Sequence, residues 1–427
     1  MKTIDVFGVS NSNIASYIQR EDVDSRFLEG LKRNKHIVVF GSSKQGKTAL
    51  TNKHLNESDF VRVNCSPETE PIDIYKSILR QLKVEFEEEK TTNSSDEISS
   101  KIGLKAKVKI PFFADSEAQG EMALKGYSGE QIKYKHIEYN LALPQDISEI
   151  LKSNNFKKRI ILENFHYLEE SAQQEMAFHL RVFEDYNILF IILGIWREKN
   201  RLAQFNGDLQ DRLIEIPVEP WKREHFQEVV KVGETLLNVS FQNVLETIID
   251  NSFDSIGVFQ ELCKECCLAA EVETTQEDRH LILQENLNTA IARKVEDYTG
   301  RHIRSLETFV EQKVKKTDEI PLYIAYYFVK YLFGLTSLNI EAGLKRPDIL
   351  AGIQANHHRP SDVRSSDMSY FLHNLTATQI KKNIIPPLFD YDRSTRKLKV
   401  IDSTLYFFLK NIDKDQLFEE FDKPAGI

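Results

Sequence analysis

One short loop constrains this chain more than any other feature of its sequence. Residues 41–48 read GSSKQGKT, which fits the pattern G-x-x-x-x-G-K-[ST]. The apolar run HIVVF before the loop predicts a buried strand, and TALTNKHL at its end predicts the start of a helix. In this context the glycines let backbone N–H groups turn inward around phosphates, and the helix N-terminus adds positive potential. The loop therefore predicts a nucleotide site rather than an ordinary glycine-rich turn.

The positions of this loop have distinct expected roles. Lys47 is expected to reach the β- and γ-phosphates, and the Thr48 hydroxyl to bind Mg²⁺. The expected cofactors are accordingly ATP and Mg²⁺. The predicted nucleotide-binding residues of the loop are Gly41, Ser42, Ser43, Lys44, Gln45, Gly46, Lys47, Thr48 and Ala49.

A phosphate-binding loop of this kind also needs an acid at the end of a neighbouring strand. The stretch KKRIILENFHYL supplies one, because its apolar run 160–162 ends at Glu163. A carboxylate there would complete the Mg²⁺ site with Thr48. The alternative is a glutamate that caps the turn after the strand. Asn164 follows directly, and an amide side chain cannot act as a general base.

The order of apolar segments predicts the fold class. Beyond Glu163, a helical pattern is followed by the apolar runs 188–196 and 212–221, which predict two further strands. Alternating strands and helices favour an α/β fold with a doubly wound parallel sheet. From Lys222 to about Val272 the pattern is helical, and linking helices follow.

Residues 88–142 interrupt this pattern and predict an insertion. A polar stretch is followed by KAKVKI, EMAL and IKYKHIEY, which alternate with period two and are separated by turn residues. We expect a β-hairpin or a three-stranded excursion from the core. A face with Lys105, Lys107 and Lys109 is either a contact for DNA or a protein partner, or a solvated strand face.

The C-terminal third has the pattern of a winged helix. Three helical segments after residue 318 precede two short strands joined by RSTRK. Residues 301–411 hold 17 Lys and Arg against 11 Asp and Glu, a local net charge of +6 in a chain of net charge −9. This favours duplex DNA as a partner, and the alternative is a winged helix used only for protein packing. The candidate DNA-binding residues are Arg364, Tyr370, Arg393, Arg396, Lys397 and Lys399.

Composition narrows the class of protein. The length of 427 residues suggests about three folding units. No apolar run approaches the roughly 20 residues that cross a bilayer, and MKTIDVFGVSNSN lacks the pattern of a secretory signal. Three of the four cysteines lie in residues 263–267 on one helical face, which favours core packing over a zinc site. A cytoplasmic location is expected.

Together these motifs resemble P-loop ATPases of the AAA+/STAND superfamily, nearest in layout to initiator and origin-recognition ATPases. In that family a strand-end acid holds Mg²⁺ and a second acid activates water. The resemblance assigns Glu163 to the metal and puts Asn164 in the position of the second acid. Either Glu163 performs both roles, or the chain binds ATP and hydrolyses it slowly, or Asn164 is an engineered substitution. The resemblance also implies that Tyr17, Ile18 and Arg20 lie over the adenine. The alternative is a plain amphipathic helix, because Ile18, Val23, Phe27 and Leu31 recur at helical spacing.

The resemblance implies further roles for two arginines. Arg212 precedes the last core strand, where the family places an arginine finger that reaches a neighbouring subunit's γ-phosphate. The alternative is a local ion pair with Asp208 or Asp211. Arg197 stands near the usual place of a polar sensor. An arginine finger would imply a homo-oligomer with ATP at its subunit interfaces.

The sequence thus predicts an ATP-dependent, oligomerising switch with slow hydrolysis. The resemblance adds prokaryotic antiviral defence or mobile-DNA control as its expected setting, with any effector activity on another chain and no membrane partner. The alternatives are a DNA-binding initiator or loader ATPase and a non-hydrolysing, protein-binding scaffold. The predicted units are an ATPase core (1–218, with its insertion at about 88–142), a helical lid with linking helices (219–317), a winged helix (318–412) and an acidic tail (413–427).

Overall fold

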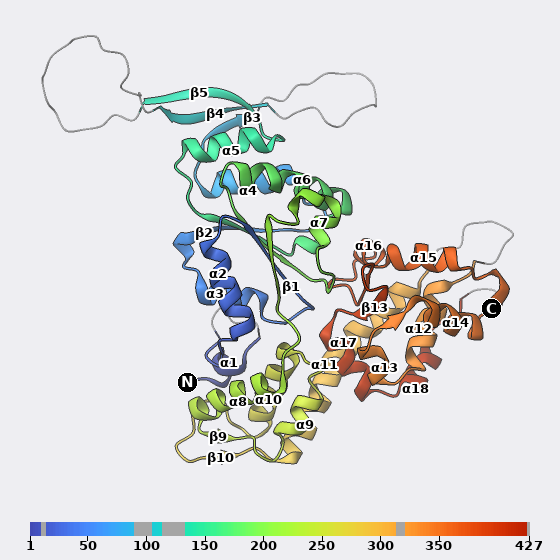
Figure 1. Ribbon diagram of the computed structural model, residues 1–427. Helices are drawn as coiled ribbons and strands as arrows, with labels where there is room; N and C mark the ends of the chain where they lie inside the picture. Colours follow the sequence, from blue (N-terminus) through green and yellow to red (C-terminus); the bar gives the residue numbers. More distant parts are fainter. Residues whose placement is uncertain (10–13, 89–104, 113–132, 313–320, 425–427) are drawn as a thin grey trace, which may run out of the picture.

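The computed structural model describes residues 1–9, 14–88, 105–112, 133–312 and 321–424. Its centre is a five-stranded sheet in the order β2-β6-β7-β1-β8, in which each neighbouring pair is parallel (Figure 1). The predicted doubly wound α/β sheet is therefore confirmed. Its strands are β1 (His36–Phe40), β2 (Phe60–Asn64), β6 (Arg159–Glu163), β7 (Phe190–Gly194) and β8 (Leu213–Pro217).

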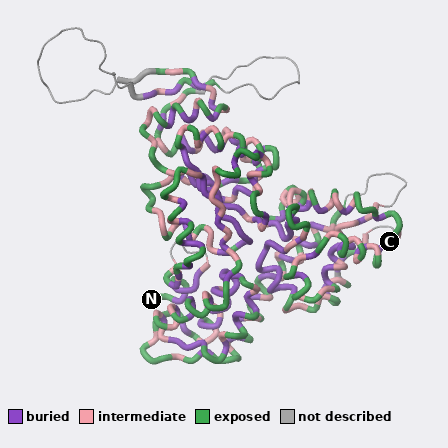
Figure 2. The backbone as a smooth tube through the Cα atoms, in the orientation of Figure 1, coloured by how far each residue is buried: buried purple, intermediate pink, exposed green. Residues whose placement is uncertain are grey.

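Both faces of the sheet are covered, which explains the uninterrupted apolar runs of its strands. Alternate residues of β1 serve different cores: Val38 and Phe40 pack in the cluster that includes α4–α6, and Ile37 and Val39 in the cluster with α2 and α3. Buried residues concentrate along this sheet (Figure 2). The helices are α2 (Arg26–Lys32), α3 (Lys47–His54), α4 (Pro71–Gln81), α5 (Pro144–Ser153) and α6 (Glu170–Asp185). Short elements are α1 (Thr3–Phe7), the π-turn η1 (Glu21–Ser25), η2 (Glu57–Asp59), η3 (Phe165–Tyr167), α7 (Arg201–Phe205) and η4 (Gly207–Leu209).

The insertion contains a second sheet beyond α5 (Figure 1). It is antiparallel, with the order β3-β4-β5: β3 (Phe86–Glu88), β4 (Lys105–Phe112) and β5 (Lys133–Asn140). The prediction of strands at KAKVKI and IKYKHIEY is correct. The third strand is β3, and the predicted EMAL strand lies outside the described residues. Ala106 and Val108 of β4 join the main core, so the insertion is anchored to the ATPase core.

A helical region follows β8, as predicted for the lid. It consists of α8 (Arg223–Leu237), α9 (Leu245–Asp250), α10 (Ile256–Ala269) and the long α11 (Gln284–Val310), with a two-stranded pair of β9 (Val239–Ser240) and β10 (His280–Leu281). Cys263, Cys266 and Cys267 of α10 are fully buried in its core. No cluster of metal-ligating side chains occurs among the described residues. The cysteines are core residues.

The C-terminal unit has winged-helix topology. Its sheet has the order β11-β13-β12, and the two long strands are antiparallel. The elements are α12 (Ile324–Phe333), α13 (Ser337–Glu341), β11 (Leu344–Lys345), α14 (Arg346–Asn356), η5 (Pro360–Asp362), α15 (Ser365–His373), α16 (Leu375–Lys381), β12 (Phe389–Asp392), β13 (Lys397–Val400), α17 (Ser403–Asn411) and α18 (Lys414–Glu420).

The predicted acidic tail is part of this unit. Helix α18 packs on α12, and Leu417 and Phe421 are buried in the winged-helix core. The acidic residues of this segment interrupt its short apolar pattern, so the sequence did not predict a buried helix there. Across the parts of the chain that the structure describes, no helix is both long enough and apolar enough to span a membrane.

Candidate nucleotide-binding site

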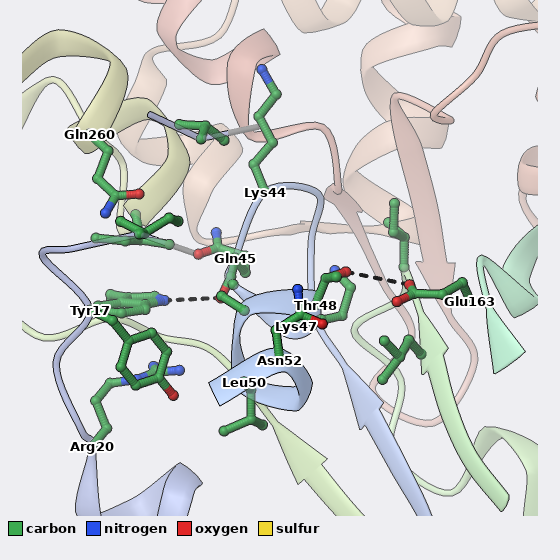
Figure 3. A pocket seen from close by; sticks show the side chains of 18 of the residues that line it. Tyr17, Arg20, Lys44, Gln45, Lys47, Thr48, Leu50, Asn52, Glu163 and Gln260 are labelled. Atoms are coloured by element: carbon green, nitrogen blue, oxygen red, sulfur yellow. Dashed lines mark hydrogen bonds between the residues drawn. The ribbon is translucent and has the colours of Figure 1, made fainter. Parts of the chain in front are cut away.

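A cavity of about 540 Å³ lies where the carboxyl edge of the central sheet meets the N-terminal segment and the lid. Figure 3 shows Lys47, Thr48 and Glu163 on one side of this cavity and Tyr17 and Arg20 on another. The predicted loop residues 44–49 line it. Ser42 and Ser43 of the same loop are buried behind it.

The loop has the conformation that its glycines allow. Gly46 has φ +85° directly before α3, so the helix begins at Lys47 with its N-terminus toward the cavity. At Gly41, with φ +155°, an added Cβ would lie 2.8 Å from Val218 Cγ2. Lys47 Nζ donates to the carbonyls of Gly41 (3.0 Å) and Ser42 (2.6 Å). Burial lowers the pKa of Lys47 to about 8, against the opposing effect of Glu219 and Glu163. A phosphate would restore a full counter-charge to this lysine.

The predicted metal ligands are close together. Thr48 Oγ1 lies 3.4 Å from Glu163 Oε2, and the interaction is marked in Figure 3. Glu163 Oε1 is buried without a hydrogen-bond partner, and its nearest cation is Arg62 at 3.7 Å. Burial raises the pKa of Glu163, and Arg62, Thr48 and Lys47 only partly offset that effect. Mg²⁺ takes one or two protein oxygens together with phosphates and water. The pair Thr48 and Glu163 fits that ion.

The residues after Glu163 form the wall of the cavity beside the metal position. Asn164 lines the cavity and adopts φ +58° at the start of the turn η3. His166 in that turn also lines the cavity, is 1% exposed, and has no hydrogen-bond partner for either ring nitrogen among the described residues. The sequence prediction missed His166. Its only signal was one polar residue in the otherwise apolar FHYL.

The predicted adenine segment lines the cavity, but it is not helical. Tyr17, Ile18 and Arg20 all face the cavity, and helical structure begins only at Glu21. Arg20 Nη1 donates to the carbonyl of Val218 (2.8 Å), and its guanidinium lies 3.8 Å from the centre of the Trp221 ring. The amphipathic-helix alternative for Tyr17–Arg20 is therefore wrong. Trp221, which the sequence prediction missed, adds an aromatic wall to the cavity.

The predicted sensor Arg197 contacts the loop, and Gln260 of the lid contacts the N-terminal segment. Arg197 Nε donates to Ser42 Oγ (2.8 Å) and pairs with Glu219 (2.8 Å), so it lies behind the loop rather than in the cavity. Gln260 of α10 lines the cavity from the lid and donates to Ser16 Oγ (3.3 Å). Gln260 thus adds a neutral amide to the cavity wall from the lid.

Arg212 lies at the opposite, amino edge of the sheet. Its guanidinium pairs with Glu184 (2.6 Å) and Asp185 (3.1 Å) at the end of α6, not with the predicted Asp208 or Asp211. Asp208 pairs with Arg181 instead (3.3 Å). The position excludes a role at this chain's own cavity and leaves a role at a neighbour's cavity as a prediction.

The winged helix docks directly on the phosphate-binding loop. Ser43 N–H donates to the carbonyl of Ile401 (3.0 Å), and Ser403 Oγ donates to the carbonyl of Ser43 (3.0 Å). This docking changes the surface expected for DNA. Arg393 lies 4.0 Å from Glu170 of the core, and half-buried Lys399 has its pKa lowered by burial and by Arg197.

The remaining DNA-binding candidates differ in exposure. Lys397 donates to the carbonyl of Ala342 (3.2 Å). Arg364, Tyr370 and Arg396 are exposed, and Tyr370 is 76% exposed. The six candidates therefore differ in how far their side chains are engaged within the chain. Three of them are available on the outside of the winged helix.

Lysines of the insertion form ion pairs within the chain. Lys105 pairs with Glu138 (2.6 Å) and Lys109 with Glu85 (2.9 Å). Lys107 and Lys109 also line an open groove between the insertion sheet and α4. The other basic residues that line this groove are Lys76, Arg80, Lys83 and His136.

Comparison with known proteins supports the fold. No protein-family model and no curated protein sequence matches the chain. The Walker-type ATPase PABY2304 of Pyrococcus abyssi is similar at 13% identity over 92% of this chain and 96% of its own, with a TM-score of 0.54. Weaker likenesses are Cdc6p of Pyrobaculum aerophilum (13% identity, 98% of each chain, TM-score 0.40) and Orc1 of Aeropyrum pernix in complex with DNA (12% identity, 98% and 96%, TM-score 0.44). The chain therefore has the fold of this Walker-type ATPase, built on a five-stranded parallel sheet.

Proposed function

We propose that this chain binds ATP with Mg²⁺ and acts as a nucleotide-dependent switch with slow hydrolysis. The observation that carries the proposal is the cavity that joins the phosphate-binding loop, the pair of Thr48 and Glu163, and the wall of Arg20 and Trp221. It combines phosphate, metal and base recognition in one place. A buried lysine lies at one end beside a buried carboxylate whose charge Arg62, Thr48 and Lys47 only partly offset, and the charges of a Mg²⁺–triphosphate would match both groups.

Slow hydrolysis is proposed from the position after Glu163. Asn164 lines the cavity beside the metal position, and its amide cannot take a proton from water at neutral pH. ATP would then persist long enough to act as a signal.

The first test is ATP binding and turnover by the purified chain. A fluorescent ATP analogue should bind in the presence of Mg²⁺, and Lys47→Ala should remove that binding. The chain should turn over slowly, and Asn164→Asp should be at least tenfold faster, because a general base contributes about 10²–10⁴ in rate. Fast turnover by the unchanged chain would overturn the slow-switch proposal, and absent binding would overturn the nucleotide site itself.

A DNA-binding initiator or loader ATPase is the second candidate function. The winged-helix topology, with Arg364, Tyr370 and Arg396 exposed, favours it. We expect binding of a labelled duplex that weakens steeply with salt. Charge reversal at Arg364 and Arg396 should weaken it further, whereas reversal of exposed Lys231 on α8 should not. Binding that ignores these substitutions would favour a protein-binding scaffold.

Assembly and biological setting rest on the sequence resemblance. A neighbour's Arg212 is proposed to complete the site in an ATP-dependent homo-oligomer. An effector protein on another chain, and a setting in antiviral defence or mobile-DNA control, stay predictions.

A further inference from the structure

His166 is a buried side chain of the cavity wall, and neither of its ring nitrogens has a hydrogen-bond partner among the described residues. Both ring nitrogens are inaccessible and without a partner, although most buried polar groups in proteins are paired. By contrast, the equally buried His36 uses both of its nitrogens, with Leu180 (2.8 Å) and Phe190 (3.0 Å). An unsatisfied buried group calls for a partner that enters the site.

The location of His166 indicates what that partner is. The side chain lines the cavity together with Lys47, Thr48 and Glu163, which are proposed for the phosphates and the metal, and with Asn164. Burial, then Lys47 and Arg201, lower its pKa well below the ordinary value. The ring is therefore neutral at pH 7 and offers one acceptor nitrogen and one donor N–H.

We propose that His166 binds the attacking water and serves as its base, in place of the acid that Asn164 does not supply. This inference rests on the proposed ATP site. The structure favours it because His166 is the side chain of this wall that combines an acceptor nitrogen, burial and the absence of any other partner. Asn164 provides an amide for orientation.

The step balances without any further reactant. The water oxygen forms a bond to the γ-phosphorus while the bond from that phosphorus to the β,γ-bridging oxygen breaks. The electron pair of the broken bond remains on the β-phosphate of ADP. One water proton passes to the acceptor nitrogen of His166 and leaves with inorganic phosphate or to solvent, which restores the neutral ring.

The test separates turnover from nucleotide binding. His166→Phe fills a similar space without nitrogens, and His166→Gln retains an acceptor and a donor. For each variant we would measure the affinity for a fluorescent ATP analogue, the melting temperature, and single-turnover release of labelled phosphate. Lys47→Ala defines the background, and the double variant His166→Phe/Asn164→Asp tests whether an acid replaces the histidine.

We expect His166→Phe to lower the hydrolysis rate at least tenfold while affinity changes less than about threefold, and the Asn164→Asp double variant to recover the rate. His166→Gln should fall between the unchanged chain and His166→Phe. An unchanged rate in His166→Phe, equal losses of affinity and rate, or a wild-type rate equal to that of Lys47→Ala would each overturn the proposal. If His166→Phe does not fold, an unchanged rate in His166→Gln together with no gain from Asn164→Asp in that background would overturn it. Failure of the chain to bind the analogue would instead count against the nucleotide site.

Discussion

The amino and carboxyl edges of the central sheet hold the same kinds of buried side chain. They differ in whether those side chains have hydrogen-bond partners within the chain. At the amino edge His36 uses both nitrogens, and Arg159 donates to the carbonyls of Leu31, Arg33 and Lys35. At the carboxyl edge Glu163 Oε1 and both nitrogens of His166 are buried without a partner. These amino-edge groups are hydrogen-bonded within the chain, whereas Glu163 Oε1 and His166 keep hydrogen-bonding capacity for a ligand.

This difference shows how one sheet separates stability from function. A satisfied buried group stabilises the fold, whereas an unsatisfied one costs free energy until a ligand compensates it. Residue type alone does not distinguish the two, since histidine, arginine and carboxylate occur at both edges. Substitutions at the carboxyl edge should therefore change nucleotide binding, and those at the amino edge should change the free energy of unfolding.

The largest expected effect is at the carboxyl edge. Lys47→Ala should weaken ATP binding about 1000-fold, a loss of about 4 kcal/mol, because the phosphates lose their buried counter-charge. Calorimetric titration checks the affinity. The melting temperature should change little, since the lysine's own pKa shows that its charge is poorly compensated in the folded chain. Normal ATP binding by Lys47→Ala, or unfolding of this variant, would contradict the proposed difference between the two edges.

The amino edge should respond to acid. Burial lowers the pKa of His36 to about 4, so between pH 6.5 and 4 the unfolded chain takes up a proton that the folded chain refuses. The free energy of unfolding should fall by about 3 kcal/mol across this window through His36. In His36→Gln, which keeps a donor and an acceptor, urea denaturation should show a pH dependence flatter by that amount. An equal pH dependence of the free energy of unfolding in both proteins would show that His36 does not cause this loss of stability.

A smaller loss of stability is expected from Arg159→Met. Methionine keeps the apolar part of the side chain but cannot donate hydrogen bonds to the loop carbonyls. This loss should lower the free energy of unfolding by about 2 kcal/mol. Affinity for ATP should stay within about twofold, since the side chain lies at the far edge of the sheet. Denaturant titration and nucleotide titration of the same preparation test both statements, and a large loss of affinity would contradict the second.

The sequence predicted most of what depends on local pattern. The loop 41–48, the strand-end Glu163 and the strands of the sheet were all found, because motif spacing and apolar runs report directly on neighbouring residues. The winged-helix order was found for the same reason. Strand β3 was missed, since three residues are too few to show a period.

The unpredicted parts of the site depend on contacts between distant segments. Trp221 reaches the cavity only because Arg20 and the loop lie beside it in the fold. The contact between Ser43 and Ile401 joins residues far apart in the chain, and no local pattern encodes it. The unused nitrogens of His166 are likewise visible only once every neighbour is known. The sequence therefore identified the loop, Glu163 and the segment Tyr17–Arg20 as parts of the cavity wall, but not Trp221 or His166.

Arg212 tests whether the amino edge has any function beyond stability. Its pairs with Glu184 and Asp185 are partly exposed, so Arg212→Ala should cost less than about 1 kcal/mol of stability. If Arg212 is an arginine finger, Glu184 and Asp185 bind its guanidinium only until a neighbouring subunit brings a phosphate close. The planar guanidinium fits a phosphate better than it fits these carboxylates. We expect the assembly to grow with ATP, as measured by mass photometry, and this growth to be lost in Arg212→Ala but retained in Arg181→Ala, the matched removal of an exposed arginine on α6. Growth that survives Arg212→Ala would make the amino edge purely structural, and the comparison between the two edges would then hold without exception.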